Sequence, residues 1–107
     1  MTRILVCADS ALPDGEAIKV EGPGEAVAVF RSNGELYALA DRCSHGNASM
    51  SEGYVEDNGT VECPLHAARF CLKTGTALCQ PATEALKTFP VALLDGQIYV
   101  DVPEAAA

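Results

Sequence analysis

The sequence predicts an all-β protein, either an antiparallel β-sandwich or a small barrel. Short apolar runs rich in Val, Ile, Leu and aromatic residues recur along the chain. Turn-forming pairs such as Asn33-Gly34 and Asp95-Gly96 separate these runs about every ten residues, a spacing typical of sandwiches and barrels. A weak helix-like piece, PATEAL at residues 81–86, is expected to form at most a turn or two.

Three hairpins are expected, each turned at a pair of residues that accepts positive φ angles. They are residues 25–42 turned at Asn33-Gly34, the region around Asn58-Gly59 before TVECP, and residues 89–102 turned at Asp95-Gly96. A two-residue loop at Asn33-Gly34 sets Phe30 opposite Tyr37. Single strands are expected at residues 3–7 (RILVC), 17–21 (AIKVE) and 69–73 (RFCLK).

The chain has 107 residues, which is enough for one domain with one modest core. We expect residues 1–107 to form a single domain whose base is built from residues 1–41 and 86–104. The remaining residues, 42–85, are expected to form a smaller lobe on that base.

The balance of charge excludes some classes of partner. Lys and Arg number 7 against 15 Asp and Glu, a formal net charge of −8. A nucleic-acid binder needs a basic face to meet phosphates, and an anionic membrane surface repels such a chain. Two interpretations of the acidity stay open: steering toward a basic patch on a protein partner, or solubility alone. No targeting segment or membrane-length apolar run is recognised, so a cytoplasmic location is expected.

The five cysteines do not suit a disulfide framework. Their odd number leaves at least one thiol unpaired, which fits a reducing compartment. Cys7 and Cys71 lie inside apolar strand-like runs, so we expect both to be small buried hydrophobic side chains. Cys79 lies in an expected loop before Gln80-Pro81, and the sequence assigns it no role.

Cysteine and histidine recur together in the expected lobe. The pattern is Cys43-x-His45, then 17 residues, then Cys63-x-x-His66. These two pairs contain both histidines of the chain, and chance is a poor explanation of that placement. Because thiolate and imidazole are metal ligands, the pattern predicts a metal site formed by these four residues.

Two kinds of metal centre match two cysteines and two histidines. Zinc accepts this set in a closed tetrahedron, but zinc-finger spacing groups the cysteines in one pair and the histidines in the other. A [2Fe-2S] cluster needs two ligands on each iron. Two segments that each supply one Cys and one His can give both thiolates to one iron and both imidazoles to the other. The spacing therefore favours the cluster over zinc.

The residues around these pairs resemble the Rieske family. The resemblance rests on DRCSHGNASMSEGY at residues 41–54 and VECPLHAARFCLKTGTAL at residues 61–78, and the hairpin pattern extends it to nearly the whole chain. In length and lack of extra domains the chain is similar to the Rieske ferredoxins of bacterial aromatic-ring-hydroxylating dioxygenases. The resemblance implies the Rieske fold, an antiparallel β-sandwich base with a smaller cluster-binding lobe. It also implies a Rieske [2Fe-2S] cluster on Cys43, His45, Cys63 and His66.

The resemblance further implies electron transfer without catalysis by this chain. Such ferredoxins take single electrons from a flavin-containing, NADH-dependent ferredoxin reductase. They pass them to a terminal oxygenase, which has its own Rieske cluster and a mononuclear non-haem iron and acts in aromatic hydrocarbon catabolism. Two alternatives stay open: the Rieske-like small subunit of an NADH-dependent nitrite reductase, and a zinc-stabilised interaction module.

A low reduction potential is also implied. High-potential members carry two extra cysteines near the cluster, and a serine and a tyrosine that hydrogen-bond to cluster sulfurs. The matching residues here are Ala48 and Leu65 for the cysteines, and Ala68 and Phe70 for the hydroxyls. Without hydrogen bonds that stabilise the reduced state, we expect a midpoint near the low end of the Rieske range, about −150 mV.

The tip of the expected lobe carries little charge. No charged residue occurs from Cys43 to Ser51 or from Cys63 to Ala68. Apolar contacts to a partner are expected from Leu65, Ala67 and Met50. An acidic surround is expected from Asp41, Glu52, Glu56, Asp57 and Glu62. Such a surround would steer the approach of a basic partner.

Overall fold

The structure, a computed structural model, describes residues 2–22, 25–42, 49–56, 58–64, 68–78 and 85–102. Within these residues it contains nine β-strands and two short 3-10 helices, which confirms the predicted all-β class. The strands are β1 (Thr2–Ala8), β2 (Ala17–Glu21), β3 (Ala26–Ser32), β4 (Glu35–Ala40), β5 (Tyr54–Val55), β6 (Thr60–Glu62), β7 (Arg69–Cys71), β8 (Val91–Leu94) and β9 (Gln97–Val102). The helices are η1 (Asp9–Ala11) and η2 (Met50–Glu52).

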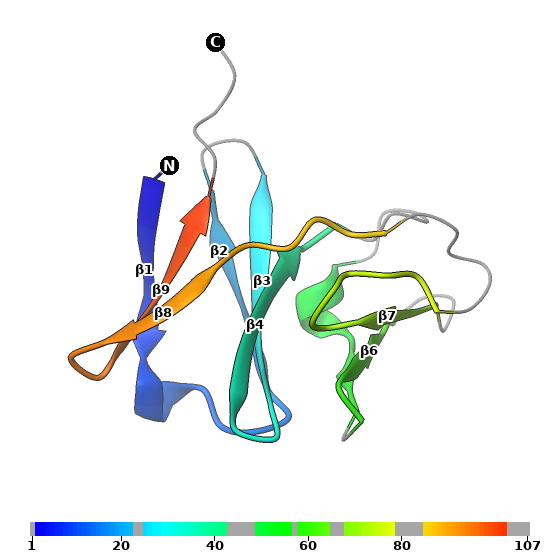
Figure 1. Ribbon diagram of the computed structural model, residues 1–107, viewed down its shortest axis with the longest axis horizontal. Coiled ribbons are helices and arrows are strands. Elements are labelled where there is room, and N and C mark those ends of the chain that lie inside the picture. The colour runs from blue at the N-terminus through cyan, green and yellow to red at the C-terminus, as the bar shows by residue number, and fades with distance from the viewer. Residues whose placement is uncertain are drawn as a thin grey trace, which may run out of the picture.

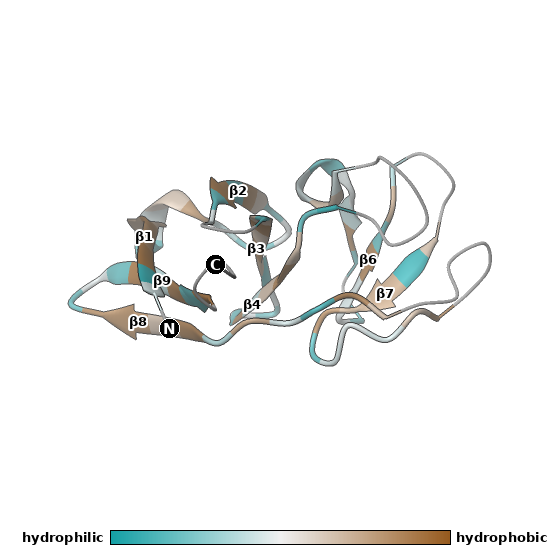
Figure 2. Cartoon of the chain, turned by 90° about the horizontal axis from the view of Figure 1, so that it is seen from above, coloured by the Kyte–Doolittle hydropathy of each residue, from teal (hydrophilic) through white to brown (hydrophobic). Residues whose placement is uncertain are grey.

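The strands form three antiparallel sheets arranged as layers (Figure 1). The first sheet has the order β1-β9-β8, the second β2-β3-β4 and the third β5-β6-β7. The first two face each other, and the third lies beyond the β2-β3-β4 sheet, as the view from above shows (Figure 2). Here the first two sheets are called the sandwich. The third sheet, with the described residues from Arg42 to Leu78, is called the lobe.

The β2-β3-β4 sheet is the middle layer, and its strand β3 is buried on both faces. Successive side chains of a strand point to opposite faces, so alternate residues of β3 enter two separate cores. Val27 and Val29 join the core of the sandwich, whereas Ala28 and Phe30 join a second core with side chains of the lobe. All four are 0% exposed, which explains why AVAVF is an unbroken apolar run.

The predicted hairpins are present, with the predicted turns. Asn33 and Gly34 have φ angles of 52° and 81°, and positive φ at both central residues is the signature of a type I′ turn. Phe30 pairs with Tyr37 across β3 and β4, as expected. The other two hairpins, β5–β6 and β8–β9, also turn through residues of positive φ, at Gly59 and at Asp95-Gly96.

The lobe contains the shortest strands of the described chain. Strand β5 has 2 residues, and β6 and β7 have 3 each. These three lie within residues 42–85, and the strands of the sandwich lie outside that range. The exact division into base and lobe stays a prediction. Residues 81–84 of the expected helix-like piece lie outside the described residues, which contain no helix long and apolar enough to cross a membrane.

The predicted burial of two cysteines needs correction. Cys7 is only half-buried against the sandwich core, and that burial raises the pKa of its thiol. Cys71 lies on the outer face of β7, because the alternation of the strand turns its neighbours Phe70 and Leu72 into the core. A hydrogen bond with the Thr74 side chain lowers the pKa of the Cys71 thiol. Cys79 lies outside the described residues.

Candidate metal centre

Cys63 is the expected ligand that the structure describes, and it lies at the end of a buried strand. It follows β6 directly and is 1% exposed. Met50, Ala68 and Phe70 belong to the same core, so the thiol of Cys63 lies in apolar surroundings. The other three expected ligands, Cys43, His45 and His66, lie outside the described residues.

Paired backbone positions, here called the first neck, close the two ends of the segment that contains His66. The backbone N–H of Cys63 donates to the carbonyl oxygen of Ala68 at 2.7 Å. Just beyond that bond, Glu62 and Arg69 are paired in the β6–β7 ladder. Cys63 and Ala68, on either side of residues 64–67, are therefore held next to each other.

A second neck holds the segment that contains Cys43 and His45. Arg42 and Ser49 form an isolated antiparallel bridge. The Met50 N–H donates to the carbonyl oxygen of Asp41 at 2.6 Å. Residues 43–48 connect the two sides of this neck, so each predicted ligand pair begins and ends at backbone positions fixed by hydrogen bonds.

The two necks pack against each other. Met50, which follows the second neck, is 0% exposed and shares a core with Cys63 of the first. Gly53 lies directly against the end of β6: a Cβ on Gly53 would be 2.4 Å from the Glu62 carbonyl oxygen. Only glycine allows this approach of two backbones, and it brings the two necks to the same end of the lobe.

A third segment, residues 79–84, is held at both ends in a similar way. The Leu78 N–H donates to the Arg69 carbonyl oxygen at 2.8 Å, and the Leu86 N–H donates to the Gly75 carbonyl oxygen at 2.8 Å. Gly75 has a φ angle of 75°, and a Cβ there would be 2.1 Å from the Leu86 carbonyl oxygen. The third segment thus starts beside the Glu62–Arg69 pair that closes the first neck.

The donor set fits a cluster held between two segments of chain. Thiolate and imidazole are the ligands of a Rieske cluster, and the buried, apolar position of Cys63 suits a metal-bound thiolate shielded from water. Among the described residues, no group of three or more His, Cys, Asp or Glu side chains gathers as an alternative metal site. The full set of Cys43, His45, Cys63 and His66 stays a prediction.

Two residues expected at the surface of this end are buried, so those expectations were wrong. Met50, expected to contact a partner, is 0% exposed because η2 turns it into the core shared with the middle sheet. Asp41, expected in an acidic surround, is 4% exposed. Its carboxylate accepts hydrogen bonds from Ser49 and Ser51, which replace water as its partners. No pattern in the sequence distinguishes these two serines from ordinary surface residues.

The two positions expected to lack hydroxyl donors are in the core of the lobe. Ala68 and Phe70 are both 0% exposed. Ala68 also accepts the backbone hydrogen bond from Cys63. Neither side chain can donate a hydrogen bond. The other two matching positions, Ala48 and Leu65, lie outside the described residues.

A profile of the Rieske [2Fe-2S] domain family matches residues 2–90. This chain belongs to the Rieske family. The predicted Rieske fold is thereby confirmed, and so is the predicted cofactor, a Rieske-type [2Fe-2S] cluster.

Curated relatives of this Rieske chain extend the match to almost its whole length. It is 58% identical over 105 residues to the 3-phenylpropionate/cinnamic acid dioxygenase ferredoxin subunit of Escherichia coli (strain K12), covering 98% of each chain. It is 60% identical over 104 residues to the ferredoxin subunit of the same name from Photorhabdus laumondii, covering 97% of this chain and 98% of the relative. The runs at residues 41–54 and 61–78 predict this similarity, which is confirmed. The chain is a Rieske ferredoxin, an electron carrier rather than an enzyme.

Solved structures show the same fold. The ferredoxin in a complex with the oxygenase of carbazole 1,9a-dioxygenase has a TM-score of 0.88 and 35% identity, covering 98% of this chain and 96% of that one. A ferredoxin of Sphingomonas yanoikuyae B1 has a TM-score of 0.86 and 33% identity, covering 95% and 100%. The small subunit of a putative NADH-dependent nitrite reductase from Mycobacterium tuberculosis has a TM-score of 0.83 and 28% identity, covering 92% and 93%. Backbone similarity alone therefore does not separate ferredoxins from such subunits.

Proposed function

We propose that this Rieske ferredoxin carries single electrons from a flavin-containing, NADH-dependent ferredoxin reductase to the terminal oxygenase of an aromatic-ring dioxygenase. The observation that carries the proposal is the 58–60% identity, over almost the whole chain, to ferredoxin subunits of 3-phenylpropionate/cinnamic acid dioxygenases. An aromatic propionate or cinnamate is therefore the substrate proposed for the oxygenase. Since the reductase uses NADH, we place the ferredoxin in the cytoplasm.

Within the lobe, we assign Cys43 and Cys63 to one iron and His45 and His66 to the other. When bound, the cluster supplies a centre that accepts and releases one electron. The chain's own contribution is to hold four ligands on two segments closed by hydrogen-bonded necks. The position of Cys63 supports this assignment, because its side chain is buried and its backbone forms the hydrogen bond that closes the neck.

Charge supports docking through the lobe. In its described part, three acids are balanced by three basic residues: Glu52, Glu56 and Glu62 against Arg42, Arg69 and Lys73. Outside residues 42–78, the described part of the chain has nine acids and four basic residues. Because the lobe is close to neutral, we expect contact there to depend on apolar packing more than on long-range attraction. Raising the salt concentration should then slow electron transfer only weakly.

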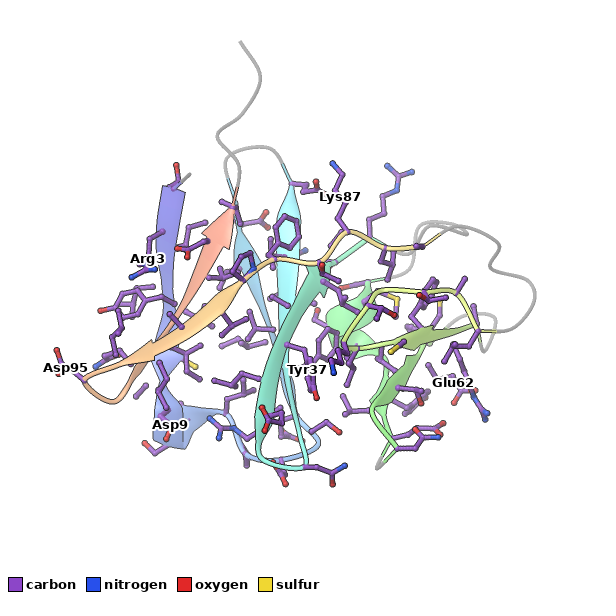
Figure 3. All side chains as sticks on the ribbon, in the orientation of Figure 1. Arg3, Asp9, Tyr37, Glu62, Lys87 and Asp95 are labelled. Atoms are coloured by element: carbon purple, nitrogen blue, oxygen red, sulfur yellow. The ribbon has the colours of Figure 1, made fainter. Side chains whose placement is uncertain are left out.

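A row of side chains crosses the outer face of the lobe next to the necks. Tyr54 pairs with Glu62 in the β5–β6 ladder, and Glu62 pairs with Arg69 in the β6–β7 ladder. Leu78 lies beside Arg69 through a backbone hydrogen bond. Tyr54 is 62% exposed and Leu78 is 50% exposed, and between them lie residues of opposite charge, Glu62 and Arg69. Arg69 forms an ion pair with Glu56 at 3.7 Å. Figure 3 labels Glu62 on this face, at the opposite end of the molecule from Asp95.

We assign this row to contact with the terminal oxygenase. The row is continuous with the neck of Cys63, since Glu62 directly precedes that residue. A related ferredoxin has been solved in complex with an oxygenase, which supports the choice of partner. A neutral surface with one aromatic and one aliphatic side chain suits a small, short-lived interface.

A matched pair of leucines tests the docking surface. Leu78 and Leu93 are each 50% exposed, but Leu93 lies on β8 in the sandwich. Replacing Leu78 with Ser should lower the oxygenase turnover supported by limiting ferredoxin about tenfold, because apolar contact area is lost. Leu93→Ser should leave that turnover unchanged, and neither change should move the midpoint potential. Equal losses of oxygenase turnover in both variants would contradict the assignment of this row to docking.

Reconstitution tests the proposed function as a whole. Purified reductase and oxygenase of a 3-phenylpropionate/cinnamic acid dioxygenase are combined with NADH, dioxygen and 3-phenylpropionate. A cis-dihydrodiol should form only when this ferredoxin is added. The match to a nitrite reductase small subunit defines the competing outcome. No dihydrodiol, together with NADH-dependent nitrite reduction when the chain is added to a nitrite reductase large subunit, would contradict the proposal.

A further inference from the structure

The inward-facing carboxylate of Asp41 has no part in the function described so far. The residue is 4% exposed, although its side chain is ionisable. Its Oδ2 accepts a hydrogen bond from the Ser49 hydroxyl at 2.6 Å, and its Oδ1 accepts one from the Ser51 N–H at 2.9 Å. The hydroxyls of the two serines lie 2.9 Å apart and hydrogen-bond to each other. A buried carboxylate needs such donors because it has lost its water.

The donors to Asp41 among the described residues are neutral. A hydroxyl and a backbone N–H satisfy the oxygens, and none of the ion pairs between described residues includes Asp41. A buried charge acts over a longer distance than a surface charge, because water screens it less.

Asp41 also closes the neck of the Cys43–His45 segment through its backbone. Its N–H donates to the Ala26 carbonyl oxygen at 3.0 Å, which ties the end of β4 to β3. Its carbonyl oxygen accepts from the Met50 N–H at 2.6 Å, which ties it to η2. One residue, Arg42, separates Asp41 from Cys43, so their Cα atoms are at most about 7.6 Å apart.

We propose that Asp41 is a positioning residue of the Rieske centre, which clamps the Cys43–His45 segment and holds a buried negative charge in its neck. The clamp consists of Asp41, Ser49 and Ser51. The charge opposes the arrival of an electron, so it keeps the reduction potential low. The inference depends on the cluster that family membership establishes, and not on which proteins donate and accept the electron.

Asp41→Asn tests the charge, because it keeps the size of the side chain and an acceptor oxygen. We expect the equilibrium constant for one-electron reduction to rise about 16-fold, which raises the midpoint potential by about 72 mV. This is the effect of removing one charge about 10 Å away at an effective dielectric constant of about 20. A redox titration of the isolated ferredoxin, followed by its EPR signal, measures the shift without any partner protein.

Two other carboxylates provide matched controls. Glu62→Gln removes a charge next to Cys63, but Glu62 is only half-buried and water screens it. Asp95→Asn removes a charge at the far turn, where Asn accepts the φ angle of 50°. The shift should be largest for Asp41→Asn, smaller for Glu62→Gln and absent for Asp95→Asn. An Asp41→Asn shift no larger than that of Glu62→Gln would overturn the role of the buried charge.

Ser49→Ala tests the clamp while leaving the charge in place. We expect a chelator to remove iron from this variant at least several-fold faster than from the wild type. Ser10→Ala, at an exposed serine of η1, should leave the rate unchanged. If Asp41→Asn retains the sandwich by hydrogen exchange but cannot hold the cluster, the clamp is supported directly. If iron loss from Ser49→Ala matches that from Ser10→Ala, the clamp is overturned.

Discussion

The sandwich and the lobe are both antiparallel, yet they are held together differently. Strands of the sandwich have 4 to 7 residues and form long ladders, with one shift of register in β1 between Leu5 and Cys7. Strands of the lobe have 2 or 3 residues, and single hydrogen bonds at the necks complete its structure. The sandwich encloses its own core, whereas the lobe shares its core with the middle sheet. We therefore expect the lobe to depend on the middle sheet and on the metal centre, whereas the sandwich should need neither the strands of the lobe nor the metal centre.

Loss of the metal centre should separate the two regions most strongly. Cys63→Ser should abolish the cluster and remove hydrogen-exchange protection in β6 and β7, because the necks lose the ligands that join them. Protection of β3 and β9 should persist, since the sandwich core is unchanged. Cys7→Ser, at a half-buried cysteine of β1, is the control and should retain the cluster. Equal loss of protection in both regions of Cys63→Ser would show that the chain is one cooperative unit.

Removing a large side chain from each core should be the next strongest effect. Phe30 and Ile98 are both 0% exposed, but Phe30 faces the lobe and Ile98 faces the sandwich core. Phe30→Ala should lower the free energy of unfolding by about 3–5 kcal/mol, and Ile98→Ala by about 2–5 kcal/mol. Urea unfolding measures both values. Only Phe30→Ala should also speed the loss of iron to a chelator. Equal iron loss from the two variants would contradict the separation of the two cores.

The sandwich was more predictable from the sequence than the lobe. Its turns depend on local chemistry, and Asn33-Gly34 and Asp95-Gly96 are identified by residue type alone. The register that pairs Phe30 with Tyr37 follows from the two-residue turn. Alternation and turn chemistry act over a few residues, so they are visible without the tertiary structure.

Predictions about the lobe were less accurate wherever tertiary contacts determine whether a side chain is buried. Met50 and Asp41 occur in a polar stretch, yet both are buried because η2 packs against the middle sheet and its serines supply hydrogen bonds. Cys71 lies in an apolar run, but alternation places it on the outer face. The cofactor was predictable because Cys43, His45, Cys63 and His66 have the side chains and the spacing that a Rieske cluster needs.

A glycine in each region should reveal a smaller difference. Gly53→Ala places a methyl group against the Glu62 carbonyl oxygen, at 2.4 Å before any adjustment. Pushing the necks apart should cost about 1–3 kcal/mol in the free energy of unfolding. Gly96→Asn, at a φ angle of 74° with open space around it, should change stability by less. Thermal unfolding of the two variants measures which loses more stability. The expectation is contradicted if Gly53→Ala is the more stable of the two.

The smallest expected effect is at the surface of the sandwich. Nε and Nη2 of Arg3 donate to the Asp101 carboxylate at 2.8 and 3.0 Å, which joins β1 to β9. Because Arg3 lowers the pKa of that carboxyl, its stabilisation is present above the ordinary aspartate pKa of about 4 and is lost as the pH falls through the lowered value. Arg3→Ala should therefore be slightly less stable than the wild type at pH 7, and the difference should shrink as the pH falls below about 4. A difference that does not shrink would assign the effect to packing.

A redox titration of the purified ferredoxin, followed by visible and EPR spectroscopy, tests the central account most directly. The account predicts a red-brown protein whose reduced form gives an anisotropic EPR signal of low average g, with a midpoint of about −150 mV. A colourless protein would contradict the cluster. A midpoint above zero would contradict the argument that Ala68 and Phe70, without hydroxyl donors, and the buried charge of Asp41 keep the potential low.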